Sequence, residues 1–203
     1  MGRSSQAKAL ENRTKIVETA AALFREFGVD QVSVADIMTA NGMTVGGFYK
    51  HFDSKDALVA EAFALAFDHS RDAWDGVFSK ADRSAENRSV ALVRQYLLNK
   101  SARRRCPLLA FAPHIANGNA TATSKKSYQA GTKELLDKFL SEAGTSGNGT
   151  DALVLFAAMV GARAMSQAVG KTDWMLEIEA AVNEAAARSD GFERAVFAGE
   201  RSA

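Results

Sequence analysis

Cysteine and proline are among the residues that this sequence has least of. Its 203 residues include one cysteine, Cys106, so no disulfide can form within the chain. Only two prolines, Pro107 and Pro113, are present to interrupt helices, while alanine occurs along the whole length. Because helix breakers are rare and a strong helix former is abundant, the composition favours an all-α fold.

Long apolar runs and an excess of one charge are also missing. No stretch of 18 uncharged apolar residues occurs, and the first residues lack the apolar core of a signal peptide. We therefore expect a cytoplasmic protein without membrane contact. The formal net charge is +1, and residues 1–60 carry seven basic and seven acidic side chains. A nucleic-acid surface would depend on where basic side chains lie, because the overall charge is nearly neutral.

The spacing of apolar residues predicts about nine helices and no strand. Apolar side chains recur at helical intervals over residues 13–27, and a long helix is predicted to begin at Lys55. That long helix carries one stripe of large apolar residues: Val59, Phe63, Phe67, Trp74 and Phe78. Further helices are predicted over about 88–102, from Pro107, and over about 121–143, 151–169 and 173–188.

Two very short helices are predicted between the first helix and Lys55. Ser33 and Asp36 have the spacing of a capping box, and Asn41-Gly42 is a turn signal. Thr44 is expected to cap the second short helix, whose Val45, Phe48 and Phe52 are expected to face inward.

Two short helices joined by a glycine turn, with a longer helix before them, form a helix-turn-helix. Such a unit places its second helix in the major groove of DNA. Gly46 and Gly47 would allow the backbone to approach the DNA, and free N–H groups at the helix start would face phosphate oxygens. The predicted DNA-binding residues are Ser33, Thr44, Val45, Gly46, Gly47, Tyr49, Lys50, His51 and Lys55.

Residues 10–60 resemble the DNA-binding domain of the TetR family of bacterial transcriptional regulators. The resemblance lies in "RTKIVETAAALFREFGVDQVSVADIMTANGMTVGGFYKHFDSKDAL". It implies a helix-turn-helix domain over 1–58 and a helical effector-binding and dimerisation domain over 59–203. It also implies a homodimeric repressor that a small apolar ligand releases from double-stranded operator DNA. Family members often carry a basic or polar residue where Val45 stands, although a valine can contact a thymine methyl group.

Aromatic side chains of the C-terminal two-thirds are candidates for an apolar effector pocket, although such stripes are more often plain core. His114 and Arg163 are polar candidates among apolar neighbours. The predicted ligand-binding residues are Phe63, Phe67, Trp74, Tyr96, Cys106, Phe111, His114, Tyr128, Phe156 and Arg163.

Small residues in the last two helices, such as Gly161, would suit a four-helix dimer seam or an intramolecular core. Cys106 leaves three interpretations open: a buried structural residue, a thiol that senses oxidants or electrophiles, and an enzyme nucleophile with His114 as base. No metal or oxyanion constellation accompanies these two residues, so we expect a non-enzymatic protein that needs no cofactor.

Overall fold

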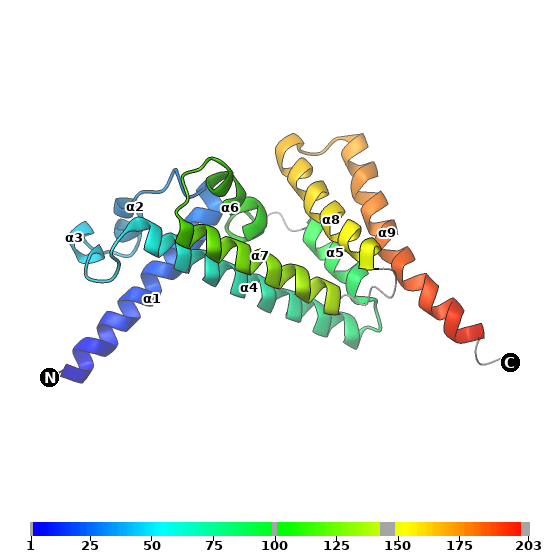
Figure 1. Cartoon of the computed structure of the whole chain (residues 1–203), viewed down its shortest axis with the longest axis horizontal. Coiled ribbons are helices and arrows are strands. Elements are labelled where there is room, and N and C mark those ends of the chain that lie inside the picture. Colours follow the sequence, from blue (N-terminus) through cyan, green and yellow to red (C-terminus); the bar gives the residue numbers. More distant parts are fainter. Residues whose placement is uncertain (1, 99–100, 143–148, 200–203) are drawn as a thin grey trace. The chain divides into compact units, whose positions relative to one another are not determined.

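The computed structural model describes residues 2–98, 101–142 and 149–199 (Figure 1). Over these residues it contains nine α-helices, one 3-10 helix and no strand, which confirms the all-α prediction. The elements are α1 (Gly2–Phe27), α2 (Val34–Ala40), α3 (Val45–Phe48), α4 (Lys55–Arg83), α5 (Arg88–Leu98), η1 (Ala102–Arg104), α6 (Pro107–Ala116), α7 (Ala122–Glu142), α8 (Gly149–Val169) and α9 (Asp173–Gly199).

The chain divides into two compact units. One consists of residues 1–70 and 100–133, and the other of residues 71–99 and 134–203. Both α4 and α7 therefore contribute residues to each unit. The domain boundary predicted at residue 58 falls within the first unit and does not coincide with this division.

Helix α1 begins earlier than the sequence pattern predicts, at Gly2 rather than near Arg13. Residues 6–11 are all exposed and lack the apolar stripe that marks a helix in sequence. Instead, Glu11 pairs with Lys8 at 3.2 Å and with Lys15 at 2.6 Å, three and four residues away. Such pairs stabilise an exposed helix by a few tenths of a kcal/mol each, roughly 0.2–0.5.

The apolar stripe of α4 is buried throughout, as predicted. Phe63 and Phe67 are fully buried in the first unit, and Phe63 stacks on Phe111 of α6 with ring centroids 4.1 Å apart. Gly131 of α7 packs directly on the Phe67 ring: a Cβ at residue 131 would lie 2.3 Å from two ring carbons. The absence of a side chain at Gly131 thus sets how closely α7 approaches α4.

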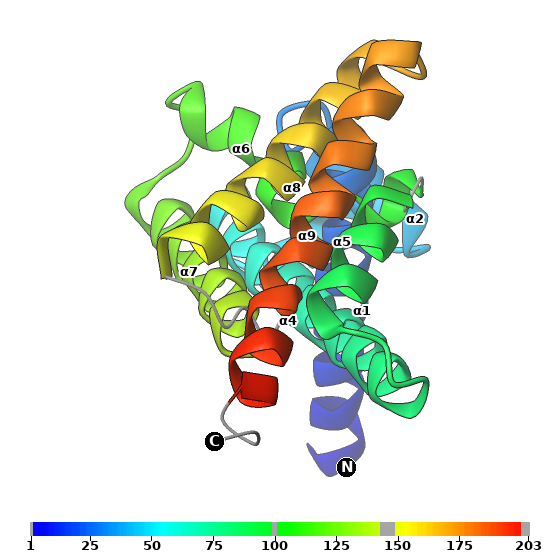
Figure 2. The same ribbon diagram turned by 90° about the vertical axis from the view of Figure 1, so that its right-hand side faces the viewer.

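In the second unit, α5, α8 and α9 lie side by side in both ribbon views (Figures 1 and 2). The residues that form their core are Leu92, Val93, Leu155, Met159, Met175, Val182 and Ala186.

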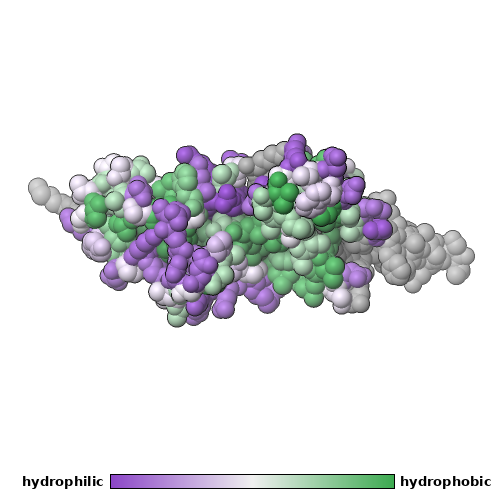
Figure 3. All heavy atoms as spheres, turned by 90° about the horizontal axis from the view of Figure 1, so that it is seen from above, coloured by the Kyte–Doolittle hydropathy of each residue, from purple (hydrophilic) through white to green (hydrophobic). Residues whose placement is uncertain are grey.

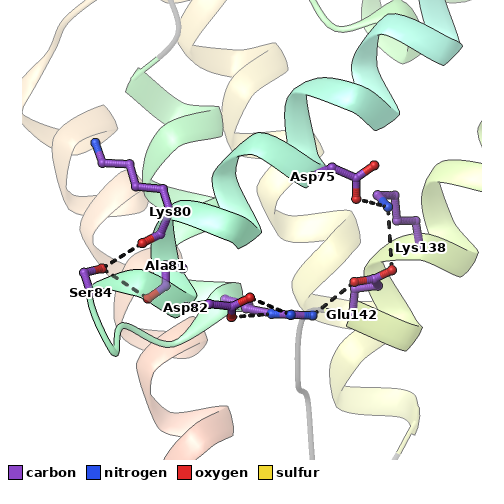
Figure 4. Close-up of polar contacts among 8 residues, drawn as sticks. Asp75, Lys80, Ala81, Asp82, Ser84, Lys138 and Glu142 are labelled. Atoms are coloured by element: carbon purple, nitrogen blue, oxygen red, sulfur yellow. Dashed lines mark hydrogen bonds and ion pairs between the residues drawn. The ribbon is translucent and has the colours of Figure 1, made fainter.

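A network of shared charges joins the C-terminal parts of α4 and α7 to the start of α5 (Figure 4). Lys138 bonds Asp75 at 2.5 Å and lies 3.7 Å from Glu142, which accepts a bond from Arg88 at 3.1 Å. Arg88 also pairs with Asp82 at 2.7 Å. Because Arg88 and Lys138 each pair with two carboxylates, the network connects α4, α5 and α7.

Helices α8 and α9 leave large apolar side chains uncovered. Hydrophobic residues gather on this part of the surface in Figure 3. The exposed ones are Leu153, Val154, Met165 and Val169 of α8, with Trp174 and Leu176 of α9. By length and composition alone α8 is apolar enough to cross a membrane, and 28% of its apolar window is buried. An exposed apolar surface of this kind is typical of an interaction site that another apolar surface covers.

Replacing Gly131 tests the contact between α7 and α4. Gly131→Ala should lower the free energy of unfolding by about 1–3 kcal/mol, because the new methyl group overlaps the Phe67 ring. Gly76→Ala is the matched control: it lies in α4 with no atom within 4 Å of its Cβ, so alanine should stabilise by up to about 1 kcal/mol. Thermal unfolding followed by circular dichroism measures both changes. A Gly131→Ala protein as stable as the parent would contradict the assignment.

Candidate nucleic-acid interface

The predicted capping box at the start of α2 is present. The Ser33 hydroxyl oxygen accepts a hydrogen bond from the Asp36 backbone N–H at 3.1 Å, and the Asp36 carboxylate accepts one from the Ser33 backbone at 2.8 Å. The Ser33 hydroxyl also donates to this carboxylate at 2.6 Å. These bonds lower the pKa of Asp36, the side-chain bond more than the backbone bond. The only hydroxyl proton of Ser33 is therefore used within the cap.

The turn between α2 and α3 is also where the sequence predicts it. Gly42 has φ +66°, in the left-handed region that favours glycine. Asn41 donates from its side chain to the Ile37 carbonyl at 2.8 Å and accepts a bond from the Thr19 hydroxyl of α1 at 3.1 Å. The turn is thus tied to α1 as well as to α2.

Helix α3 is held by two aromatic rings. Phe48 is fully buried and Phe52 is 3% exposed, and their rings stack at 5.5 Å. The Arg13 guanidinium of α1 lies 4.4 Å from the centre of the Phe52 ring and forms two hydrogen bonds with Glu61 of α4, one of them 2.6 Å long. Arg13 thus joins α1, α4 and the segment after α3 at a single point.

Two details of the prediction for α3 are wrong. Val45 does not face inward: it is the first residue of α3 and 44% of it is exposed, although it lies only three residues before the buried Phe48. Thr44 occupies the N-cap position but its side chain makes no capping hydrogen bond. Both side chains are therefore exposed together with Gly46, Tyr49 and Lys50, whereas Gly47 and His51 are half-buried.

Lys55 links the start of α4 to the segment after α1. Its ammonium group donates to the Val29 carbonyl at 2.9 Å and lies 6.0 Å from the Phe24 ring. Burial lowers the pKa of Lys55, and the carboxylates of Asp30 and Asp36 partly oppose this change. One of its three N–H donors is thus used inside the domain, and within the described part of the chain the other two are left for another acceptor.

Helix α6 is bonded to the segment between α1 and α2. His114 is buried, and its Nδ1 lies 2.6 Å from the Asp30 carboxylate, which also accepts a bond from Asn119 at 3.0 Å. The desolvation of Asp30 raises its pKa, but the bonds from His114 and Asn119 outweigh it and lower the pKa below its ordinary value. His114 Nε2 is buried without a hydrogen-bond partner among the described residues.

A second connection lies between η1 and α1. Arg25 donates from Nε to the Arg105 carbonyl at 2.6 Å, and Arg103 pairs with Glu26 at 2.8 Å. Cys106 follows as the N-cap of α6 and is half-buried. Sequence reasoning missed Asp30 and Arg25, because each has its partner about 80 residues further along the chain and no local pattern marks such pairs.

Apart from Cys106, the predicted ligand-binding residues fall into two groups. Phe63, Phe67, Phe111, His114 and Tyr128 are joined by ring contacts in the first unit, where the Tyr128 hydroxyl donates to the Leu108 carbonyl at 2.9 Å.

The second group lies in the second unit and consists of Trp74, Tyr96, Phe156 and Arg163. There Phe156 contacts Phe139 with ring centroids 5.4 Å apart, and Arg163 donates to the Leu97 carbonyl at 3.3 Å.

Comparison with known proteins identifies the helix-turn-helix. Residues 16–62 match the family described as bacterial regulatory proteins, tetR family. A probable acrEF/envCD operon repressor of Escherichia coli K12 is 38% identical over 61 residues, which are 30% of this chain and 28% of that protein. The transcriptional repressor KstR2 of Rhodococcus jostii is 45% identical over 49 residues, or 24% of each chain. The helix-turn-helix is similar to those of tetR-family regulators.

Outside the helix-turn-helix, this chain resembles tetR-family proteins in fold and not in sequence. The curated relatives are matched over less than a third of their length. A crystal structure of a TetR transcriptional regulator from Chloroflexus aurantiacus superimposes with a TM-score of 0.66 at 22% identity, covering 92% of this chain and 96% of the other. The relatives and this neighbour are transcriptional regulators, in agreement with the expectation of a non-enzymatic protein.

Replacing Asp30 tests the bond between α6 and the helix-turn-helix. Asp30→Ala leaves a buried histidine without its partner and should lower the free energy of unfolding by about 1–3 kcal/mol, towards the lower end because Asp30 is partly exposed. Asp30→Asn keeps an acceptor for His114 and should cost less. Thermal unfolding of both variants, with the exposed Asp72→Ala as control, measures the effect.

The stabilisation that the bond between His114 and Asp30 provides should decrease in acid. The pKa of Asp30 is lowered in the folded state, so its contribution is complete above the ordinary pKa of a carboxyl group, about 4, and is lost as the pH falls through the lowered value. The stability difference between parent and Asp30→Ala should therefore shrink in acid. A difference that grows below pH about 4 would contradict this account.

Proposed function

We propose that this protein is a homodimeric regulator of transcription that binds operator DNA and responds to a small apolar effector. The observation that carries the proposal is α3, a helix with two glycines and an exposed start, within a domain that matches the tetR family. We further propose that it acts in the cytoplasm and represses transcription until the effector releases it from the DNA.

Helix α3 is proposed to enter the major groove. Thr44, Val45 and Gly46 at its start are exposed and would face base edges. Gly46 is suited to close approach, because a Cβ there would have no atom of the protein within 4 Å.

The residues after α3 are proposed to contact the DNA backbone. Tyr49 and Lys50 are exposed, and His51 is half-buried. Lys55 can reach a phosphate with the N–H donors that Val29 leaves unused. These contacts would position the domain without reading sequence.

The effector is proposed to act through α6. The aromatic group around Phe63 and Phe111 offers an apolar surface, and His114 of this group is bonded to Asp30 beside the helix-turn-helix. An effector would shift the DNA-binding helices only if it binds the released arrangement more tightly than the DNA-bound one. Movement of α6 would then reach the helix-turn-helix through Asp30, and movement of η1 through Arg25.

The apolar face of α8 and α9 is proposed to form the dimer seam. It carries exposed side chains such as Val154 and Trp174, and Gly161 lies within α8 with open space around its Cβ. A second copy of the same face would cover these side chains and pair the two DNA-binding domains, as a two-fold interface does.

A thiol sensor is the second candidate function, and the position of Cys106 favours it. The preceding residue, Arg105, holds α1 through Arg25, so a covalent change at the half-buried thiol would disturb that bond. Titration with iodoacetamide, with operator affinity measured before and after, tests it. A thiol that reacts slowly, or reacts without changing affinity, contradicts this candidate.

Selection from a random double-stranded DNA library tests the leading proposal. The full chain should enrich a two-fold symmetric sequence, and its affinity should fall steeply with salt concentration because bound phosphates release counterions. Screening apolar molecules for release of the selected complex then identifies the effector class. Recovery of no preferred sequence contradicts the proposal.

Gly46→Ala tests whether Gly46 contacts the DNA or serves only the fold. The added methyl group meets no atom of the protein within 4 Å, so the thermal midpoint should stay or rise, by up to about 1 kcal/mol in free energy. Operator affinity should nevertheless fall, because the methyl group occupies space next to the base edges. Thermal melting and operator titration measure the two effects. A stabilised variant with the affinity of the parent would remove Gly46 from the interface.

Gly161→Leu tests the dimer seam. A leucine at this position has open space within the protomer, so folding should be preserved, whereas close approach of a second α8 should be blocked. Sedimentation should show a larger monomer fraction than for the parent. Gly76→Leu, at an open position of α4, serves as the control and should leave the association state unchanged. A folded, fully dimeric Gly161→Leu protein would place the seam elsewhere.

A further inference from the structure

The helices proposed to face DNA carry almost none of the side chains that read bases by paired hydrogen bonds. Arginine and lysine read guanine in this way, and asparagine and glutamine read adenine. From Ser33 to Tyr49 the sequence contains no arginine, lysine or glutamine and a single asparagine, Asn41. Asn41 is half-buried, and both ends of its amide are bonded, to Ile37 and Thr19. Base reading by α2 and α3 must therefore rest on other contacts.

Asp36 and Ser33 already bond each other at the start of α2, which makes them poorly suited to base reading. Their hydroxyl and carboxylate groups bond each other in the capping box. A carboxylate that accepts two hydrogen bonds there keeps its charge, as the lowered pKa indicates, and would be repelled by phosphates. The remaining exposed positions of α2 include alanines and Thr39.

Val45 is the one large side chain at the exposed start of α3. It is 44% exposed, and the two residues that follow it are glycines, so nothing on the next positions of the helix shields its methyl groups. Gly46 is exposed and open, which lets the backbone beside Val45 come close to a surface. A partner that buries this side chain must itself be apolar at the point of contact.

The major groove offers one apolar group, the 5-methyl group of thymine. We propose that Val45 packs on a thymine methyl group in each half of the operator and so determines the base preference at that position. The proposal rests on the proposed function, since it assumes that α3 lies in the major groove. It predicts that the protein recognises the base at this position through contact with a methyl group. A polar side chain at residue 45 would instead recognise the base by hydrogen bonds.

Thymine-to-uracil substitution tests the contact, because it removes that methyl group and changes no Watson–Crick pairing. With the full chain and its selected operator, each thymine of one half-site is replaced by uracil in turn. One replacement should weaken binding about fourfold, the effect of exposing one buried methyl-sized group. In Val45→Ala that penalty should vanish, while the penalties of other replacements stay as in the parent.

Leu98→Ala is the control, since it truncates an exposed apolar side chain of α5, outside the helix-turn-helix and the proposed dimer seam, and should keep the fourfold preference. Thermal melting verifies that Val45→Ala is folded. If the chain binds a selected operator but no uracil replacement weakens it, or if the penalty persists in Val45→Ala, the proposal for Val45 is overturned while the proposed function stands. If no sequence is selected at all, both fall.

Discussion

A four-residue helix cannot stabilise itself, and the position of α3 depends on the burial of two aromatic rings. Forming a first helical turn is unfavourable, so α3 forms only because Phe48 and Phe52 are held in the core. The Arg13 guanidinium covers the Phe52 ring and binds Glu61, and it thereby joins α1 and α4 to the same point. The side chains exposed around α3 are positioned by what lies beneath it.

This arrangement explains why the polar contacts of the first unit converge on the helix-turn-helix. Asp30 receives His114 and Asn119, while Asp56 receives the hydroxyl groups of Thr121 and Ser124. Each bond joins the 100–133 segment either to the connection between α1 and α2 or to the start of α4. These two positions flank the short helices α2 and α3, so a movement of the 100–133 segment would reach the parts of the chain on either side of them.

Local patterns in the sequence were sufficient for most of the fold. The capping box at Ser33, the glycine turn and the buried stripe of α4 involve residues a few positions apart, so their spacing carries the information. The early start of α1 was missed because its first turns are stabilised by charge pairs rather than by an apolar face. The apolar character of Val45 predicts an inward position, whereas its place at a helix start leaves it exposed. The bonds of Asp30 and Arg25 depend on the packing of segments far apart in the chain, which spacing cannot reveal.

The contact of Gly131 with the Phe67 ring has a consequence for how this sequence can diverge. Any side chain at residue 131 collides with the ring, whereas a smaller residue at 67 is accommodated at the expense of a cavity. Divergence at the two positions therefore has a preferred order: the ring must shrink first, and only then can the glycine be replaced. A lineage that takes the steps in reverse passes through an overpacked intermediate, so descendants of this sequence should retain the glycine for as long as they retain the ring.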